Sequence, residues 1–354
     1  MEALFIKKDS PNKVRFSSKT TYYQNPSIFR PKTIFFTIWL LLLISASAQA
    51  QNQPFFAPAD TLDKVRFYSA LGIGVSSFTA TSVGLYNSWY KQFEQSDFHL
   101  FNDWREWKGM DKMGHAYTAY NLCNIGYQGA RWTGISKRSG LLIAGIGSTA
   151  IQTTIEIMDG FSTKWGFSVG DVVFNSVGTS LFIVQEAFWD EQKFRLKISS
   201  NSIEYEDRLL TSQNGNTTSI FDRVDDLYGS RGIERFLKDY NAQTIWLSAN
   251  IRSLVPNAPV PHWLNLSFGY STENLLGGFE NSWRVGDDIF HAPNNLYPRY
   301  HQFILSLDAD LNRIKTKSHF LNMLLALTNS FKIPAPAVEY NSVGEWRFYL
   351  VYRG

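Results

Sequence analysis

The chain has 354 residues, of which 44% are hydrophobic and 16% aromatic, and this length suggests two domains more readily than one. The formal net charge is +3, but residues 1–50 hold seven basic and two acidic side chains, so the rest carries about −2. A chain so close to neutrality lacks the electrostatic footprint of a nucleic-acid-binding protein, and we expect no nucleic acid among its partners.

The first fifty residues have the pattern of an export signal. Arg30 and Lys32 precede the apolar run TIFFTIWLLLLISASA, which ends in the small-x-small sequence of residues 48–50, Ala-Gln-Ala. We therefore expect residues 1–50 to be a signal peptide and the mature chain to begin near Gln51. A retained membrane anchor is the alternative, because the segment before the apolar run is long. Both interpretations place the protein in the cell envelope, on the periplasmic side or at the outer membrane.

Residues 51–193 are predicted to form four helices. Asp60 or Thr61 can cap the first helix, which has no charged residue from 67 to 90. Three more charge-poor segments follow, at residues 113–130, 139–155 and 172–185. They are rich in Gly, Ser, Thr and Asn, which allow close helix packing in lipid, and they lack the charged face of a soluble bundle. We expect a membrane-associated four-helix bundle, with a buried bundle outside the membrane as the alternative.

From residue 194 onward, apolar and polar residues alternate in a pattern that favours half-buried strands. We expect a helix at 221–240, a long loop at 273–300, either a strand or a helix at 319–331, and an edge or extended segment at 333–341, where there are two prolines. The alternating segments lie at residues 195–205, 244–254, 263–271, 302–312 and 346–353.

About seven candidate strands result, whereas a single-chain barrel needs an even number of at least about eight. The fold class is therefore predicted as α+β, with a helical domain at 51–193 and an antiparallel β domain at 194–354. A partial or small barrel is the alternative form of the β domain.

Polar side chains recur at helical spacing on the otherwise apolar segments. Burying such groups is costly unless they find partners, so we expect them to converge in one cluster. The members of this predicted cluster are Asp111, Lys112, His115, Gln152, Glu156, Asp159, Ser168, Asp171 and Asn175.

Two interpretations of this cluster remain open. It could be a chemical site, with His115, Glu156, Asp159 and Asp171 as candidate catalytic residues and the first three also as candidate ligands of a divalent metal. It could instead be a structural network that fixes helix register. Ser168-x-x-Asp171 matches a capping box, and Asp159-Gly160 is a turn signal. We expect no organic cofactor.

The blocks HLFNDWREWKGMDKMGHAYTAY and IEIMDGFSTKWGFSVGDVVFNSVG resemble the signature segments of the YfiM-like family, predicted periplasmic lipoproteins of unknown function. The order of their polar residues is also similar, more faintly, to that of the VanZ-like membrane proteins. The resemblance covers residues 97–180 and implies an envelope protein. The chain departs from the lipoprotein label, because no acceptor cysteine follows the apolar run.

Together these observations predict a non-enzymatic envelope membrane protein with a structural or scaffolding role. Membrane lipids and other envelope proteins are its expected partners. The alternative is a membrane-embedded enzyme that acts on a lipid or a lipid-linked cell-wall substrate through His115, Glu156, Asp159 and Asp171.

Overall fold

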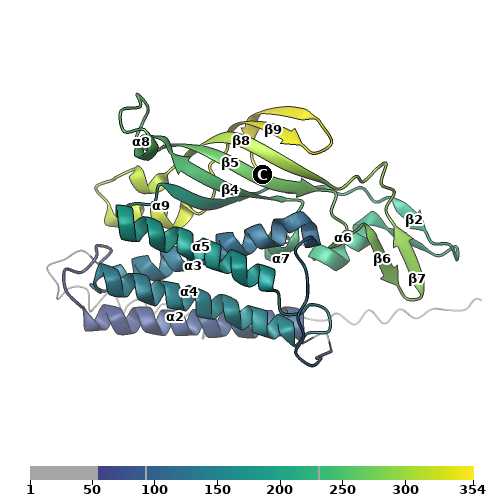
Figure 1. Ribbon diagram of the computed structural model, residues 1–354, viewed down its shortest axis with the longest axis horizontal. Helices are drawn as coiled ribbons and strands as arrows, with labels where there is room; N and C mark the ends of the chain where they lie inside the picture. Colours follow the sequence, from purple (N-terminus) through teal and green to yellow (C-terminus); the bar gives the residue numbers. More distant parts are fainter. Residues whose placement is uncertain (1–54, 92–93, 230–231) are drawn as a thin grey trace, which may run out of the picture. The chain divides into compact units, whose positions relative to one another are not determined.

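Four long helices form the first part of the fold (Figure 1). The computed structural model describes residues 55–91, 94–229 and 232–354, all within one compact unit, Gln53–Gly354. The signal peptide and its cleavage site lie outside the described residues. The helices are α2 (Lys64–Leu85), extended by η2 (Tyr86–Tyr90), α3 (Met110–Trp132), α4 (Lys137–Gly160) and α5 (Val169–Trp189).

The start of each long helix is determined locally. Asp63, Ser136 and Ser168 cap α2, α4 and α5, because their side-chain oxygens accept hydrogen bonds from backbone N–H groups that lack a helical partner. Helix α3 has no such cap. It follows the short helix η3 (Glu106–Gly109), in which residues 107–109 all have positive φ, so a left-handed turn sets its direction.

Helices α3, α4 and α5 pack closely around a core of small and aromatic side chains. Tyr120, Tyr127 and Phe182 form edge-to-face ring contacts at the centre of this core. Gly178 of α5 lies directly against the backbone of α3, where a Cβ atom would overlap the carbonyl oxygen of Ala116. The bundle therefore depends on a glycine at this crossing.

Six strands form an antiparallel sheet in the order β1-β4-β5-β8-β9-β10. Met110 of α3 packs with Ile198 and Ile245 of the first two strands, which joins the bundle to the sheet. The strands are β1 (Phe194–Ser200), β4 (Gln243–Asn250), β5 (Leu264–Glu273), β8 (Tyr300–Ala309), β9 (Ala335–Asn341) and β10 (Trp346–Tyr352).

The sheet curls strongly but stays open. Four strand-to-strand steps separate β4 from β10, about 19 Å in a flat sheet. Nevertheless, the hydroxyl groups of Thr244 and Tyr352 are 3.0 Å apart, and the rings of Trp246 and Tyr352 are in contact. Among the described strand pairs, β1 and β10 are not joined, so the small barrel considered from the sequence is not closed.

The two faces of this sheet have the reverse of the usual polarity. Ser267, Ser306 and Asp308 of β5 and β8 point inward and are buried, whereas Phe268 and Leu305 point outward and are about half exposed. Soluble antiparallel sheets normally bury the apolar side and expose the polar side. The alternation expected from the sequence is present, but its apolar side is the outer one.

Smaller elements fill the connections. The segment 221–240 forms two short helices instead of one, and the predicted loop at 273–300 contains a hairpin. The ambiguous segment at 319–331 is mainly helical. These elements are η4 (Leu311–Arg313), α6 (Ile220–Tyr228), α7 (Gly232–Lys238), α8 (Ile251–Leu254), α9 (His319–Thr328) and the strand pairs β2 (Leu209–Thr211) with β3 (Thr217–Ser219) and β6 (Ser282–Val285) with β7 (Asp288–His291).

Two expectations need correction. Most of the segment at 333–341, including Pro336, forms β9, which is an inner strand rather than an edge. Pro336 is tolerated because pairing with β8 ends at Ala337 and the pairing with β10 shifts register beside it. The four-helix membrane bundle is also not shown. Of the described helices, only α4 is long and apolar enough to cross a membrane by length and composition.

Candidate functional site

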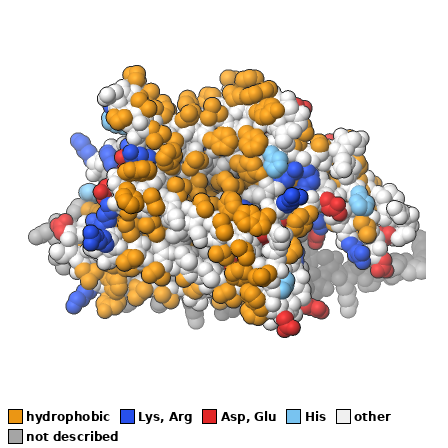
Figure 2. Space-filling model, in the orientation of Figure 1, with side chains coloured by type: hydrophobic (Ala, Val, Ile, Leu, Met, Phe, Trp, Pro, Cys, Tyr) orange, Lys and Arg blue, Asp and Glu red, His pale blue; other side chains and the backbone are white. Residues whose placement is uncertain are grey.

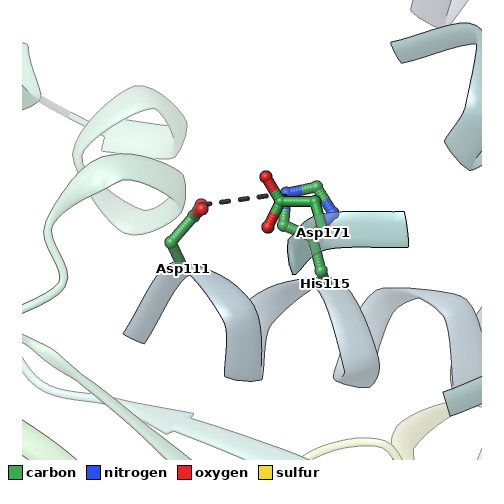
Figure 3. A group of neighbouring side chains, drawn as sticks. All are labelled: Asp111, His115 and Asp171. Atoms are coloured by element: carbon green, nitrogen blue, oxygen red, sulfur yellow. Dashed lines mark ion pairs between the residues drawn. The ribbon is translucent and has the colours of Figure 1, made fainter. Parts of the chain in front are cut away.

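The candidate site lies where the N-terminal end of α3 meets α4 and α5. Asp111 and His115 are one turn apart on α3, and Asp171 reaches the same point from the first turn of α5 (Figure 3). Tyr240 donates a hydrogen bond of 2.8 Å from its hydroxyl group to Asp111, so the site also contacts the segment between α7 and β4. Asp171 is 56 positions after His115 in the chain, so only folding brings it to Asp111 and His115.

Lys112 is the cationic centre of the site. Its ammonium Nζ lies 2.7 Å from Asp103, 2.7 Å from Asp171 and 3.0 Å from Asp111, and its side chain is only 2% exposed. The three carboxylates hold the pKa of Lys112 above its ordinary value, although burial opposes them. Lys112 therefore stays charged and ties the loop before α3 to α3 and α5.

His115 is held by amide side chains from the other two helices. Its Nδ1 lies 3.1 Å from Asn175 Oδ1, and Gln152 donates to that same oxygen at 2.6 Å. Its Nε2 faces carboxylate oxygens of Asp111 and Asp171 at 3.8 and 3.6 Å. Nδ1 of the ring thus lies beside a neutral amide, with Glu156 Oε1 further away at 3.6 Å, and Nε2 faces two acids.

Glu156 and Ser168 complete the connection between α4 and α5. Ser168 accepts a hydrogen bond from the backbone N–H of Asp171 and donates one to Asp103, and its own N–H points at Glu156 at 3.4 Å. A capping box would use the Asp171 carboxylate for that last contact. Because Glu156 takes this place, the Asp171 carboxylate is available to Lys112 and His115.

Three acids of the site, Glu156, Asp159 and Asp171, have pKa values above those of free acids. Burial raises the pKa of Glu156 to about 8 and that of Asp159 to about 6. Burial and the neighbouring Asp111 raise the pKa of Asp171 to about 7. Burial alone would lower the pKa of His115, but the carboxylates of Asp111, Asp171 and Glu156 outweigh it, and its pKa is raised.

All nine residues of the predicted cluster lie on the facing ends of α3, α4 and α5 or beside them. Asp159 differs from the others, because its closest partner is the hydroxyl group of Tyr90, which donates to it at 2.7 Å. Beside His115 Nε2, the structure places Asp111 and Asp171 instead of the predicted metal candidates Glu156 and Asp159. These three groups could hold a metal ion, since their ligand atoms lie within 4.8 Å of one another.

Three further members of the site were missed by the sequence argument: Asp103, Tyr90 and Tyr240. Asp103 lies in an irregular segment, where helical spacing gives no signal. The tyrosines are amphipathic and look like core residues in the sequence. Tyr240 is 129 positions from Asp111, so only the tertiary structure brings them together.

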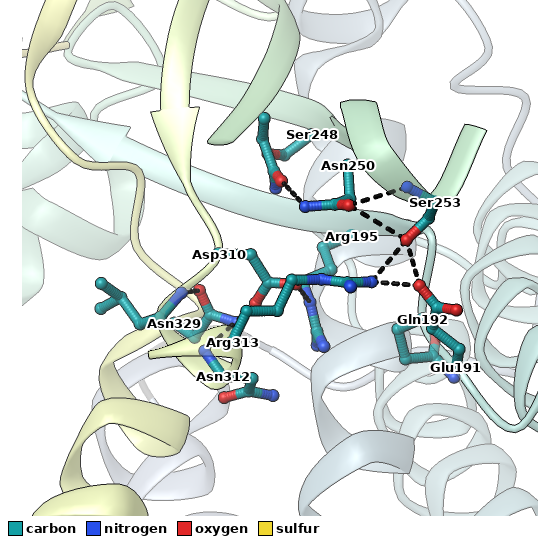
Figure 4. Close-up of polar contacts among 12 residues, drawn as sticks. Glu191, Gln192, Arg195, Ser248, Asn250, Ser253, Asp310, Asn312, Arg313 and Asn329 are labelled. Carbon is teal, nitrogen blue, oxygen red and sulfur yellow. Dashed lines mark hydrogen bonds and ion pairs between the residues drawn. The ribbon is translucent and has the colours of Figure 1, made fainter. Parts of the chain in front are cut away.

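A second polar cluster joins the sheet to α5 and α9 (Figure 4). Asp310 forms ion pairs with Arg195 at 3.2 Å and with Arg313 at 3.0 Å. It also accepts a hydrogen bond of 2.8 Å from the side-chain amide of Asn329. Arg313 also pairs with Glu191. The two positive charges of the arginines equal the two negative charges of the acids, so this cluster has the character of a structural network.

The fold and the first site define a mixed helical and antiparallel protein with a buried histidine–carboxylate cluster. The family model described as "Predicted periplasmic lipoprotein (DUF2279)", a domain of unknown function, matches residues 99–187. That quarter of the chain holds every residue of the predicted cluster. Comparisons with curated proteins and with solved structures each gave no match. The family match supports an exported, envelope-associated protein.

Proposed function

We propose that the protein is a non-enzymatic, membrane-associated protein of the cell envelope with a structural or scaffolding role. In this proposal the outer face of the six-stranded sheet contacts the acyl chains of membrane lipids. The reversed polarity of the sheet carries the proposal, because an apolar-out, polar-in alternation is the pattern of strands that face lipid.

The strand register makes the outer face continuous. One row of apolar side chains runs across five strands, and the next row runs parallel to it. The first row consists of Leu247, Phe268, Leu305, Val338 and Phe348, and the second of Ile245, Tyr270, Phe303, Tyr340 and Trp346. Ile245 and Tyr270 are covered by α3, and most of the other members are a third exposed or more. An apolar patch of this extent on a protein surface normally marks an interaction site.

The inner rows of the same strands support the same orientation. Ser248, Ser267 and Ser306 are paired across β4, β5 and β8, and all three are at most 3% exposed. Deeper in the sheet, Lys197 and Asp308 form an ion pair with no exposure to solvent. In a soluble protein this polar side would normally face water and the apolar side would be buried. The sheet of this protein has the opposite arrangement.

The helices add to the apolar surface. Helix α2 has a single buried residue, Arg66, and exposes Leu71, Ile73, Val75 and other apolar side chains. Helix α4 exposes Leu142, Ile143 and Ile146. Figure 2 shows hydrophobic side chains spread over both the sheet and the helices on the face in view. Lipid contact would remove these groups from water, which is favourable by about 25 cal/mol for each Å² of apolar surface.

A labelling experiment tests lipid contact directly. Cys123, the only cysteine of the chain, is fully buried and can be replaced by Ala. A polarity-sensitive fluorophore on Leu305→Cys should then shift to the blue in phospholipid vesicles and be quenched by spin-labelled acyl chains. The same label on Thr211→Cys, an exposed position of β2, serves as the matched control.

The native protein gives a second readout. We expect it to stay with membranes during an alkaline carbonate wash. Complete release by the wash, together with identical spectra for the Leu305 and Thr211 labels, would refute the proposal. Other envelope proteins that compete with lipid for this face would be found by crosslinking through the same Leu305→Cys position.

The alternative function is a membrane-embedded enzyme acting on a lipid or lipid-linked cell-wall substrate. It is favoured by one observation: the side chains of His115 and Asp111 are 19% and 20% exposed, beside the buried acid Glu156. His115→Ala separates the two proposals. A structural role predicts a lower protein level, whereas an enzymatic role predicts a normal level and a failure to complement a deletion strain.

A further inference from the structure

We propose that Asp111, His115 and Asp171 bind one divalent transition-metal ion. The ligands in this proposal are Nε2 of His115 and one carboxylate oxygen from each aspartate. This inference does not depend on lipid contact, because it rests on the three helix ends and not on the sheet.

The separations of the donor atoms suit such an ion. Nε2 of His115 lies 3.6 Å from Asp171 Oδ1 and 3.8 Å from Asp111 Oδ1. Both separations are too long for a direct hydrogen bond. A zinc ion with bonds of about 2.1 Å holds tetrahedral ligands about 3.4 Å apart. Shifts of a few tenths of an ångström would bring each of these two nitrogen–oxygen separations to that spacing, and the ligand atoms of all three residues lie within 4.8 Å of one another.

The tautomer of His115 also fits a ligand role. Gln152 donates to Asn175 Oδ1, so this oxygen is oriented as an acceptor toward the imidazole ring. The neutral ring then carries its proton on Nδ1, and the lone pair of Nε2 points at the two carboxylates. A hydrogen-bonded partner on the non-ligating nitrogen is typical of histidines that bind metals.

Acidic side chains outnumber basic ones around the site. Five acids gather here against a single lysine and His115. The acids are Asp103, Asp111, Glu156, Asp159 and Asp171. Glu156 gives an independent indication, because this side chain is fully buried and its Oε1 has no hydrogen-bond partner among the described residues; the nearest basic group is His115 Nδ1 at 3.6 Å. A metal ion on Nε2 would strengthen the positive charge that faces this oxygen.

The rival occupant is a proton. Protonation of His115 would place an N–H between the same two carboxylates, and Lys112 already contacts Asp171 Oδ1 at 2.7 Å. The donor set nevertheless favours a particular class of ion. One imidazole with carboxylates suits Zn²⁺ or Mn²⁺, whereas Mg²⁺ and Ca²⁺ prefer sites made entirely of oxygen.

The experiment uses full-length protein without a histidine tag, freed of metal by a chelator and titrated with Zn²⁺ by calorimetry. We expect one Zn²⁺ per chain, release of protons on binding and an increase in Tm. His115→Gln should weaken binding at least 10-fold. Asn175→Leu, which removes the positioning amide and no ligand, should weaken it about 10- to 100-fold. The matched control is His291→Gln, because the side chain of His291 is exposed on β7 and belongs to neither polar cluster; this variant should bind Zn²⁺ as the native protein does.

Substitution of Co²⁺ gives a spectroscopic readout, since a nitrogen- and oxygen-bound tetrahedral ion has intense visible absorption that His115→Gln should abolish. Asp111→Asn provides a second ligand variant if His115→Gln does not fold, because Asp111 lies at the more exposed edge of the site. The proposal is overturned if the metal-free protein binds no stoichiometric Zn²⁺, or if both ligand variants bind it as tightly as the His291→Gln control. A site that holds a proton only would give the first of these results.

Discussion

Lys112 shows how one buried charge can hold several elements. It contacts acids from the loop before α3, from α3 itself and from α5, and its own side chain is only 2% exposed. Burying a charge is costly, and the cost is recovered only while the partners remain. Removing one member of such a cluster therefore lowers the free energy of unfolding by more than the loss of its hydrogen bonds alone, because buried charges are left without partners.

We expect Lys112→Met to lower the free energy of unfolding by about 3–5 kcal/mol, because it leaves buried carboxylates without a cation. Denaturant unfolding of the purified protein measures the change. Lys137→Met is the matched control: Lys137 pairs with Asp190, which is 76% exposed, so its loss should cost at most about 1 kcal/mol. Equal effects of the two substitutions would contradict a structural role for Lys112.

Glu156 should make the metal-free protein sensitive to pH. Its pKa is raised to about 8 in the folded state, above the ordinary value of 4.5, because burial disfavours the charged form. The protonated Glu156 therefore contributes to the free energy of unfolding. This contribution is complete below about pH 4.5 and is lost as the pH rises toward about 8. The raised pKa of His115 acts in the same direction, with its contribution complete below its ordinary pKa of 6.5.

We therefore expect the unfolding free energy to fall between pH 5 and pH 8, by at most about 1.4 kcal/mol per pH unit for each such group. Glu156→Gln should reduce this slope, and Glu234→Gln, on the surface helix α7, should leave it unchanged. Unfolding in the presence of a chelator at several pH values is the measurement. A slope that Glu156→Gln does not alter would show that this acid is not buried as described.

At the scale of elements, the crossing of α3 and α5 depends on a close backbone approach. Gly178 allows this approach, and Ser148 of α4 donates to the backbone of α3 nearby at 2.9 Å. The same packing brings Asn175 and Asp171, about one and two turns before Gly178 on α5, to His115. The geometry of the site is thus a consequence of helix packing rather than of the site residues alone.

We predict that Gly178→Ala destabilises the protein by about 1–3 kcal/mol, because the added methyl group must push α5 away from α3. Gly147→Ala is the control, since no atom lies within 4 Å of its added Cβ. Alanine favours helix more than glycine does, so this control should be stabilising by about 0.5–1 kcal/mol. Thermal unfolding of the two variants measures these changes. A Gly178→Ala variant with unchanged stability would be inconsistent with the tight crossing of α3 and α5.

At the scale of the whole molecule, α3 is shared by the bundle and the sheet. Its first turns carry the histidine–carboxylate site on one side and pack Met110 against Ile198 and Ile245 on the other. Because α3 supplies core residues to both the bundle and the sheet, we expect the unfolding of one to destabilise the other.

We expect the bundle and the sheet to unfold in one transition. Ile245 is 1% exposed, so Ile245→Ala should cost about 2–5 kcal/mol and should shift the helical signal and the tryptophan signal equally. Far-ultraviolet circular dichroism and fluorescence, followed in the same denaturant series, test this. A helical signal that survives after the sheet has unfolded would contradict the coupling.

The sequence by itself predicted most of the elements and an exported, envelope-associated protein. Charge-free segments with cap residues predicted the four long helices, and strict alternation predicted most of the strands. It also indicated which polar residues of α3, α4 and α5 should gather, because each polar stripe, such as Asp111 with His115, lies on an otherwise apolar segment and needs partners from other helices.

Only the tertiary structure decided which side of the sheet is buried and which atoms meet. Alternation in a strand is symmetric, so it cannot say whether Ser306 or Leu305 points inward. The partners Asp103, Tyr90 and Tyr240 come from irregular or distant segments, where periodicity carries no information. Position in space follows from packing contacts such as Gly178 on α3 and Met110 on the sheet, and these long-range contacts have no signature in the local sequence.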